Sequence, residues 1–264
     1  MFITVKSDAA AMKTAILLIA HGAHESEGND SAEKNGARLK EMTGMEVYQG
    51  YLHLDPTIDA AAGKMLADGV ERIIAIPLFV FPGFLPDNSV RKELGLAPGT
   101  AKGVFQKDGK SAEIVFTGTF ADHPLIENVL VDVCKEYNAN PDDTSVMLIF
   151  HGSRNAAGSE LVDQCVGYLA KRGYEAMASY NEFQSPTVEE ATDCLIKKGK
   201  NVLAIPVFVS PGGHTTSDIP PKLGVDGSRT RDLGGGKKLN YAKEIGMHNG
   251  IADILKARID ELKL

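Results

Sequence analysis

Two histidines and a glutamate in the second half of the sequence are spaced so that they could share one metal ion. His151 ends the apolar run 146–150, Glu182 lies at the end of the segment 177–183, and His214 follows the apolar run 203–209. Two imidazoles and a carboxylate form a borderline-soft ligand set, which suits Co, Ni, Fe or Zn better than Mg or Ca. Two or three protein ligands leave coordination positions open, which favours chemistry or metal transfer over a structural site.

These three side chains can meet only if the segments before them are neighbouring strands of one parallel sheet. The run 203–209 is short, apolar and rich in β-branched residues, as expected of a strand buried on both faces. Pro211, Gly212 and Gly213 break the strand just before His214. Ligands of open α/β sheets bind outside the carboxyl ends of the strands, so the three side chains are expected to converge there.

The chain carries much the same pattern twice, which predicts two similar domains. A strand pattern ending in His-Gly occurs at 15–22 and again at 146–152. A helix pattern that begins near Pro-Thr occurs at 56–66 and 186–196, and a strand pattern ending in Pro-Gly occurs at 73–83 and 202–212. Strands alternate with helices in both copies, so each half should be a doubly wound α/β unit with a four-stranded parallel sheet. The polar stretch 138–144 sets the expected boundary, giving domains 1–140 and 141–264.

The two halves differ in the residues that could do chemistry. The first half keeps His21, but Leu85 stands where the second half has His214, and either Leu52 or His53 stands where it has Glu182. We therefore expect the chemistry to be confined to the second half, although a part for His21, His24 or His53 stays open. His123 and His248 precede helix patterns and are expected to cap them.

Two polar insertions, 98–110 and 226–238, are interpreted as mobile loops at the carboxyl side of each sheet. The first interpretation is that they are solvated connectors. The alternative is that Arg229, Arg231, Lys237 and Lys238 form a flap over an anionic ligand.

Composition excludes several classes of protein. A net charge of −7 disfavours nucleic acid as a partner, and no apolar run is long enough for a transmembrane helix. Three widely spaced cysteines fit a reducing cytoplasm rather than a disulfide framework. The sequence lacks G-x-S-x-G, Walker A and G-x-G-x-x-G motifs, which disfavours a hydrolase, an NTPase and a dinucleotide-binding protein. Met12 is a second possible start, which would make 1–11 a leader.

The motifs HGSR at 151–154 and PGGHTTSDIP at 211–220, with Glu182 before a Pro-Thr-Val helix start, resemble the class II chelatases of tetrapyrrole synthesis. The most similar branch is that of the sirohydrochlorin cobaltochelatases, and the resemblance covers nearly the whole chain. It implies that His151 and His214 are metal ligands, that Glu182 is the acidic group beside the macrocycle, and that the active site lies in the cleft between the halves.

The resemblance further implies insertion of a divalent metal, with Co2+ preferred, into sirohydrochlorin or a related tetrapyrrole, without ATP and in cobalamin-type biosynthesis. The metal is a substrate, no organic cofactor is expected, and the protein would be a cytoplasmic monomer or homodimer. Candidate substrate-binding residues are Ser153, Arg154, Pro211, Gly212, Gly213, Phe84 and Leu85, and Lys222 is a further candidate cation for the substrate carboxylates. Alternatives are a ferrochelatase or nickelochelatase, a non-catalytic tetrapyrrole or metal carrier, and a zinc-dependent hydrolase.

Overall fold

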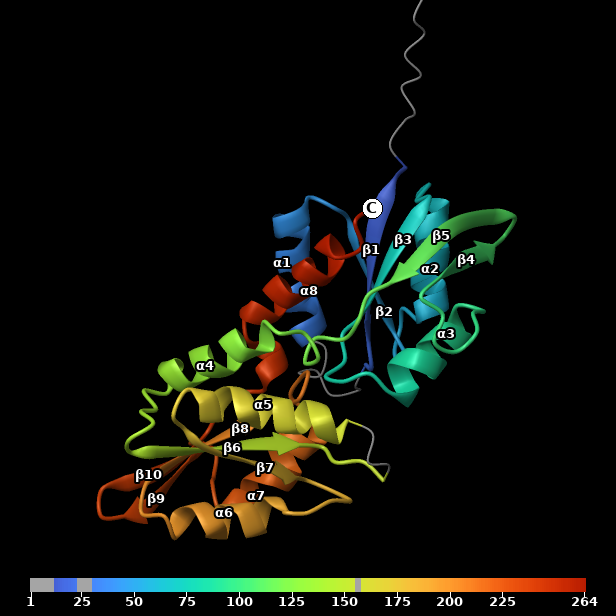
Figure 1. The fold of residues 1–264 in the computed structure, drawn as a ribbon. Coiled ribbons are helices and arrows are strands. Elements are labelled where there is room, and N and C mark those ends of the chain that lie inside the picture. The colour runs from blue at the N-terminus through green and yellow to red at the C-terminus, as the bar shows by residue number, and fades with distance from the viewer. Residues whose placement is uncertain (1–11, 23–29, 155–157) are drawn as a thin grey trace, which may run out of the picture.

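The computed structural model describes residues 12–22, 30–154 and 158–264, which form two α/β lobes (Figure 1). His24 and the possible leader 1–11 lie outside these residues. The first sheet has the strand order β2 (Val47–Tyr51), β1 (Thr14–Ala20), β3 (Arg72–Pro77), β5 (Lys110–Phe116) and β4 (Lys102–Lys107). The second has the order β7 (Glu175–Tyr180), β6 (Thr144–Phe150), β8 (Asn201–Pro206), β10 (Lys237–Tyr241) and β9 (Thr230–Gly234).

The expected fold class is confirmed, with one addition to each sheet. Four strands of each sheet run parallel, and an antiparallel edge strand, β4 or β9, follows them. The central strands are buried on both faces, and alternate residues serve different cores. In β6, Val146 and Leu148 belong to one hydrophobic cluster, whereas Met147 and Ile149 belong to another.

Helices cover both faces of each sheet. The first lobe contains α1 (Asp30–Thr43), α2 (Ile58–Ala67), the π-helical segment η2 (Leu85–Ser89) and α3 (Val90–Glu93), and α4 (Ile126–Glu136) follows. The second contains α5 (Ser159–Lys171), α6 (Val188–Ile196), the π-helical segment η3 (His214–Asp218) and α7 (Ile219–Leu223), followed by the 3-10 turn η4 (Ile245–Met247) and α8 (Gly250–Asp260). None of the helices in the described ranges is long and apolar enough to cross a bilayer.

The helix that follows each sheet packs on the other lobe. Figure 1 shows α8 beside α1 of the first lobe and α4 beside α5 of the second, and both pairs are in contact. Hydrogen bonds hold the turn before α8 against α1. Lys34 and Asn35 of α1 donate to the carbonyls of Met247 and Gly246 at 2.6 and 3.0 Å. One hydrophobic cluster contains residues of β1, α4, β6 and α8, so the two lobes share a core. The division at 140/141 stays a prediction.

The interpretation of 98–110 and 226–238 as loops at the carboxyl side of the sheets is wrong. These segments contain the edge strands β4 and β9, and their hairpin turns lie at the amino end of β5 and β10, away from the carboxyl ends. Asp108 and Gly109 have φ values of 51° and 74°, as a tight hairpin turn requires.

The two arginines of the second hairpin donate hydrogen bonds within the protein, and its two lysines lie at the amino end of the sheet. Arg229 donates to the carbonyls of Tyr241 and Ala242, and Arg231 donates to the carbonyl of Leu223 at 3.0 Å. Lys237 and Lys238 begin β10, at the amino end of the sheet. The alternative of a cationic flap over the carboxyl ends is therefore also wrong.

Candidate metal centre

His151 and Glu182 are placed side by side by the ends of β6 and β7. The amide N–H of Glu182 donates to the carbonyl oxygen of His151 at 2.9 Å, which extends the strand pairing by one step. Gly152 makes this approach possible because a Cβ at its position would lie 1.9 Å from the carbonyl oxygen of Glu182, and its φ of +89° suits glycine. The His-Gly pair therefore sets the position of both candidate ligands.

His214 is presented by the first residue of η3, directly after the glycines that end the β8 segment. A hydrogen bond from the core holds this turn, because the hydroxyl of the buried Tyr241 donates to the carbonyl of Thr215 at 3.0 Å. The side chain of Asp218, four residues further on, lies 2.7 Å from Nδ1 of His214. A ring nitrogen held by a carboxylate fixes both the orientation and the tautomer of a ligating histidine.

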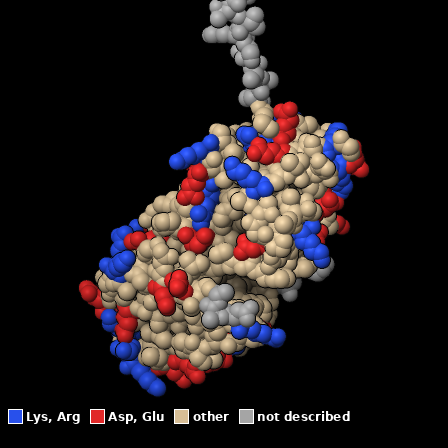
Figure 2. Space-filling model, turned by 45° about the vertical axis from the view of Figure 1, so that its right-hand side comes forward, with Lys and Arg blue, Asp and Glu red and all other residues tan. Residues whose placement is uncertain are grey.

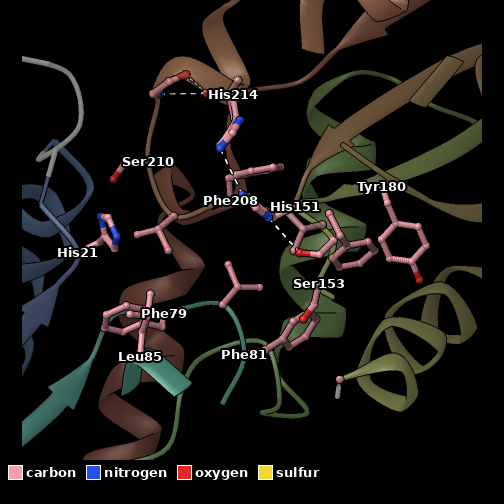
Figure 3. Close-up of a pocket in the computed structure, with 18 of the residues that line it drawn as sticks. His21, Phe79, Phe81, Leu85, His151, Ser153, Tyr180, Phe208, Ser210 and His214 are labelled. Atoms are coloured by element: carbon pink, nitrogen blue, oxygen red, sulfur yellow. Dashed lines mark hydrogen bonds between the residues drawn. The ribbon is translucent and has the colours of Figure 1, made fainter. Parts of the chain in front are cut away.

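The hydrogen bonds of the two histidines leave their Nε2 lone pairs directed at each other. Nδ1 of His151 lies 2.9 Å from the carbonyl of Gly152, which can only accept, so this nitrogen carries the proton. Nδ1 of His214 donates to Asp218 by the same reasoning. The two Nε2 atoms are 3.2 Å apart (Figure 3). Two lone pairs at this distance repel unless a cation or proton lies between them.

The separation of the two nitrogens suits a metal ion. Nitrogen ligands about 2.1 Å from one ion, at an angle of roughly 100°, would stand this far apart. Glu182 completes the group, because one ligand atom each from His151, Glu182 and His214 lie within 4.8 Å of one another. The carboxylate of Glu182 is 4.0 Å from His214 Nδ1, so it is near the pair without being bonded to it.

Asn181 and Lys222 support this centre from one side. The ammonium group of Lys222 donates to the carbonyl and to the side-chain oxygen of Asn181 at 2.9 and 2.8 Å. The amide nitrogen of Asn181 faces Nδ1 of His214 at 3.2 Å but makes no hydrogen bond to it, because the shorter contact with the Asp218 carboxylate makes Nδ1 a donor. Two of the three N–H donors of Lys222 are thus engaged within the protein, and its role as a cation for substrate carboxylates stays a prediction.

The candidate centre opens into a cavity of about 610 Å³ between the lobes. His151 and His214 lie in the wall formed by the second lobe, and His21 lies in the wall formed by the first (Figure 3). Much of the remaining lining is aromatic or aliphatic, and the rings of Phe81 and Phe150 stack across the lobes with centroids 5.8 Å apart. Figure 2 shows the surface hollowed between the lobes, with both signs of charge interspersed over the visible face.

Most of the substrate-binding candidates lie around this cavity. Its lining includes Leu85, Ser153, Pro211, Gly212 and Gly213. The backbone N–H of Ser153 donates to the side-chain oxygen of Gln184 at 2.8 Å. Phe84 and Arg154 are not part of the lining, and Phe84 is 74% exposed. Arg154 stacks instead on Phe183, with its guanidinium carbon 4.9 Å from the ring centroid.

Phe183 was not identified from the sequence. It directly follows Glu182, is 54% exposed and has a φ of 62°, an unfavourable conformation for a bulky side chain. Strained residues persist where the surrounding structure determines them, often beside functional sites. Asp218, Asn181 and Gln184 were also given no role. Two signals could have pointed to Asp218, since it lies inside the motif PGGHTTSDIP and is a carboxylate four positions after a candidate ligand.

The first lobe repeats the arrangement with other side chains. His53 donates its N–H to the carbonyl of His21 at 3.1 Å, as Glu182 does to His151, so His53 rather than Leu52 occupies the place of Glu182. Leu85 begins η2 as His214 begins η3. Partial burial in the cleft lowers the pKa of His21, the Gly22 carbonyl raises it, and His53 lowers it. His21 is therefore favoured in its neutral form.

The two remaining described histidines lie just before helices, as predicted, but the N-cap residues themselves are Leu125 and Asn249. Nδ1 of His123 accepts the N–H of Leu125, and Nδ1 of His248 accepts the N–H of Gly250, both at 3.1 Å. Both bonds lie at the start of a helix.

Comparisons with known proteins give one consistent result. A family model described as CbiX matches residues 15–137 and 145–262. The sirohydrochlorin cobaltochelatase of Methanosarcina acetivorans is 34% identical over 122 residues, which are 94% of that protein and 44% of this chain. SirB from Bacillus subtilis with Fe3+ has a similar fold, with a TM-score of 0.77 and 16% identity over 95% of each chain. SirB from B. subtilis subspecies spizizenii in complex with cobalt has a TM-score of 0.68 and 15% identity, again over 95% of each chain.

Proposed function

Because this chain belongs to the CbiX family, we propose that it is a chelatase that inserts a divalent metal ion into sirohydrochlorin or a closely related tetrapyrrole. The observation that carries the proposal is the pair of Nε2 atoms 3.2 Å apart in the wall of a cavity between two lobes. The relatives named sirohydrochlorin cobaltochelatase support the choice of substrate.

The chemistry follows from the residues present. Inserting M2+ forms four metal–nitrogen bonds in the macrocycle and releases two pyrrole N–H protons, so the site must deliver a cation and accept protons. Neutral His151 and His214 would hold the metal, and open coordination positions would let the macrocycle nitrogens replace its other ligands. Glu182 would accept or relay a departing proton, since its carboxylate is near both imidazoles.

The cavity supports the binding of a macrocycle. Its aromatic and aliphatic lining, including Phe79, Phe81, Phe150 and Phe208, suits the flat apolar face of a tetrapyrrole. The carboxylates at the macrocycle edge would lie toward the cavity mouth, and Arg154, whose guanidinium stacks on Phe183, is our candidate to bind them. Phe84 and Leu85 would form the apolar rim on the first lobe.

We propose Co2+ as the metal, in cobalamin-type biosynthesis, because the similar curated proteins are named cobaltochelatases. The same ligands would also accept Fe2+ or Ni2+, since imidazole and carboxylate bind all three. We propose that ATP is not needed, because the sequence lacks a Walker A motif. Both cleft walls come from one chain, so the reaction could proceed in a cytoplasmic monomer or in either subunit of a homodimer.

Metal insertion can be measured by the change in the visible absorption of sirohydrochlorin. The full chain should insert Co2+ faster than the spontaneous reaction, equally with and without ATP, and parallel assays with Ni2+ and Fe2+ give the metal preference. His151→Ala and His214→Ala should nearly abolish the acceleration while His248→Ala retains it. Binding of sirohydrochlorin without acceleration by any of the three metals would instead indicate a carrier.

A further inference from the structure

The first lobe carries an imidazole pair of its own, of which His21 lines the cavity and His53 lies beside it. The ring centroids of His21 and His53 are 4.6 Å apart, with 66° between the ring planes. The corresponding values for His151 and His214 are 4.7 Å and 85°. Two edge-to-face imidazole pairs of nearly equal spacing therefore occur in the two lobes, and His21 faces the same cavity as His151 (Figure 3).

The backbone beneath His21 is the same as that beneath His151. Nδ1 of His21 lies 3.1 Å from the Gly22 carbonyl, as Nδ1 of His151 lies 2.9 Å from the Gly152 carbonyl. A carbonyl oxygen can only accept, so Nδ1 of His21 carries the proton and Nε2 keeps its lone pair. A neutral imidazole with a free Nε2 is the form that binds metals.

We propose that His21, which lines the cavity opposite His151 and His214, and the exposed His53 beside it form a second binding site for a borderline divalent cation. Among the described residues the site has two protein ligands, because Leu85 stands where the other lobe has His214. Water would fill the remaining positions, so binding should be weaker than at the centre in the second lobe.

The location suggests what such a weak site would do. A cation held at His21 and His53 would lie at the first-lobe side of the cavity, and His21 could pass it toward His151 and His214 across the cavity. We infer that this site stages the incoming metal, a role that rests on the proposed chelatase function. Binding of the cation itself does not depend on that function.

The binding claim can be tested by equilibrium dialysis of the full chain against Co2+ alone. The wild type should bind two ions with different affinities. The variant His151→Ala/His214→Ala should keep only the weaker ion, and adding either His21→Ala or His53→Ala should remove it. Adding His248→Ala instead is the matched control, which should retain the ion because Nδ1 of His248 accepts a helix N–H. Circular dichroism establishes that each variant is folded.

The outcomes of these experiments test the second cation site and its staging role separately. Loss of all Co2+ from His151→Ala/His214→Ala would overturn the second site and leave the proposed function intact. Retention of the weaker ion after His21→Ala and His53→Ala would place it elsewhere and overturn the assignment. For the staging role, His21→Ala in an otherwise unchanged chain should raise the KM for Co2+ in the insertion assay more than it lowers kcat. A fall in kcat with an unchanged KM would overturn staging while leaving the binding site in place.

Discussion

The carboxylate of Asp218 lies 2.7 Å from Nδ1 of His214, which is the side of the ring turned away from His151. This contact fixes the imidazole so that Nε2 faces the candidate metal position. Removing such a partner from a metal-ligating histidine typically costs about 10–100-fold in affinity or activity. The π-helical turn from His214 to Asp218 therefore belongs to the metal centre as much as the histidine does.

Asp218→Ala should weaken binding of Co2+ by about 10–100-fold, because Nδ1 loses its acceptor and the ring can rotate or change tautomer. Asp218→Asn should restore part of the affinity, since the amide oxygen still accepts from Nδ1. Binding is measured by Co2+ titration, with Asp132→Asn on the exposed face of α4 as the control. Equal affinities in Asp218→Ala and the wild type would show that the contact does not orient the ligand.

Glu182→Gln should lower kcat for metal insertion by about 10²–10⁴-fold, because the amide keeps the shape of the side chain but cannot accept a proton. The loss should be mainly in kcat, with a smaller change in Co2+ affinity. Initial rates at saturating metal and tetrapyrrole, together with Co2+ titration, separate the two effects. Unchanged turnover would assign Glu182 to the protein surface without a part in the reaction.

Phe183→Gly should weaken tetrapyrrole binding without weakening the fold. Glycine adopts the φ of 62° without the strain of a bulky side chain, and Phe183 is 54% exposed, so little burial is lost. The melting temperature should be unchanged or higher, while the KM for the tetrapyrrole rises because an aromatic face beside Glu182 is removed. Asn138→Gly, at a φ of 51° remote from the cavity, is the control that should leave that KM unchanged. A lower melting temperature with an unchanged KM would make Phe183 a structural residue.

The alternating strand and helix patterns were sufficient to predict the fold class, although not the fifth strand of each sheet. The buried strands β1, β3, β6 and β8 have continuous apolar sequences, so their parallel pairing followed from composition and order. The edge strands could not be identified in this way, because β4 (KGVFQK) and β9 (TRDLG) are largely polar and lie at the sheet edge. The Asp108-Gly109 pair was a hairpin signal that the interpretation as a loop overlooked.

The site was predictable where it depended on strand ends and unpredictable where it depended on turns. His151, Glu182 and His214 each follow a parallel strand, so one rule brought them together. The resemblance to chelatases is confirmed by the CbiX match. The contact of Asp218 with His214 depends on a π-helical turn, and the exposure of Phe183 depends on a positive φ. The sequence shows Asp218 inside the motif at 211–220 but does not show the π-helical turn, and it gives no sign of the positive φ of Phe183.

Gly152→Ala should disrupt the candidate centre although it changes none of the candidate ligands. The new Cβ would lie 1.9 Å from the carbonyl oxygen of Glu182, at a φ of +89° that alanine rarely adopts. Relief of this clash must separate the ends of β6 and β7, and with them His151 and Glu182. We expect a loss of about 1–3 kcal/mol in the free energy of unfolding and a large loss of Co2+ affinity.

Gly167→Ala is the matched control for Gly152→Ala. Gly167 lies inside α5, and a Cβ there would contact nothing within 4 Å. It should therefore stabilise the protein by up to about 1 kcal/mol through helix propensity and leave Co2+ binding unchanged. Urea unfolding and Co2+ titration of both variants provide the measurements. If Gly152→Ala bound Co2+ as tightly as Gly167→Ala, the close approach of His151 and Glu182 would not be needed to hold the metal.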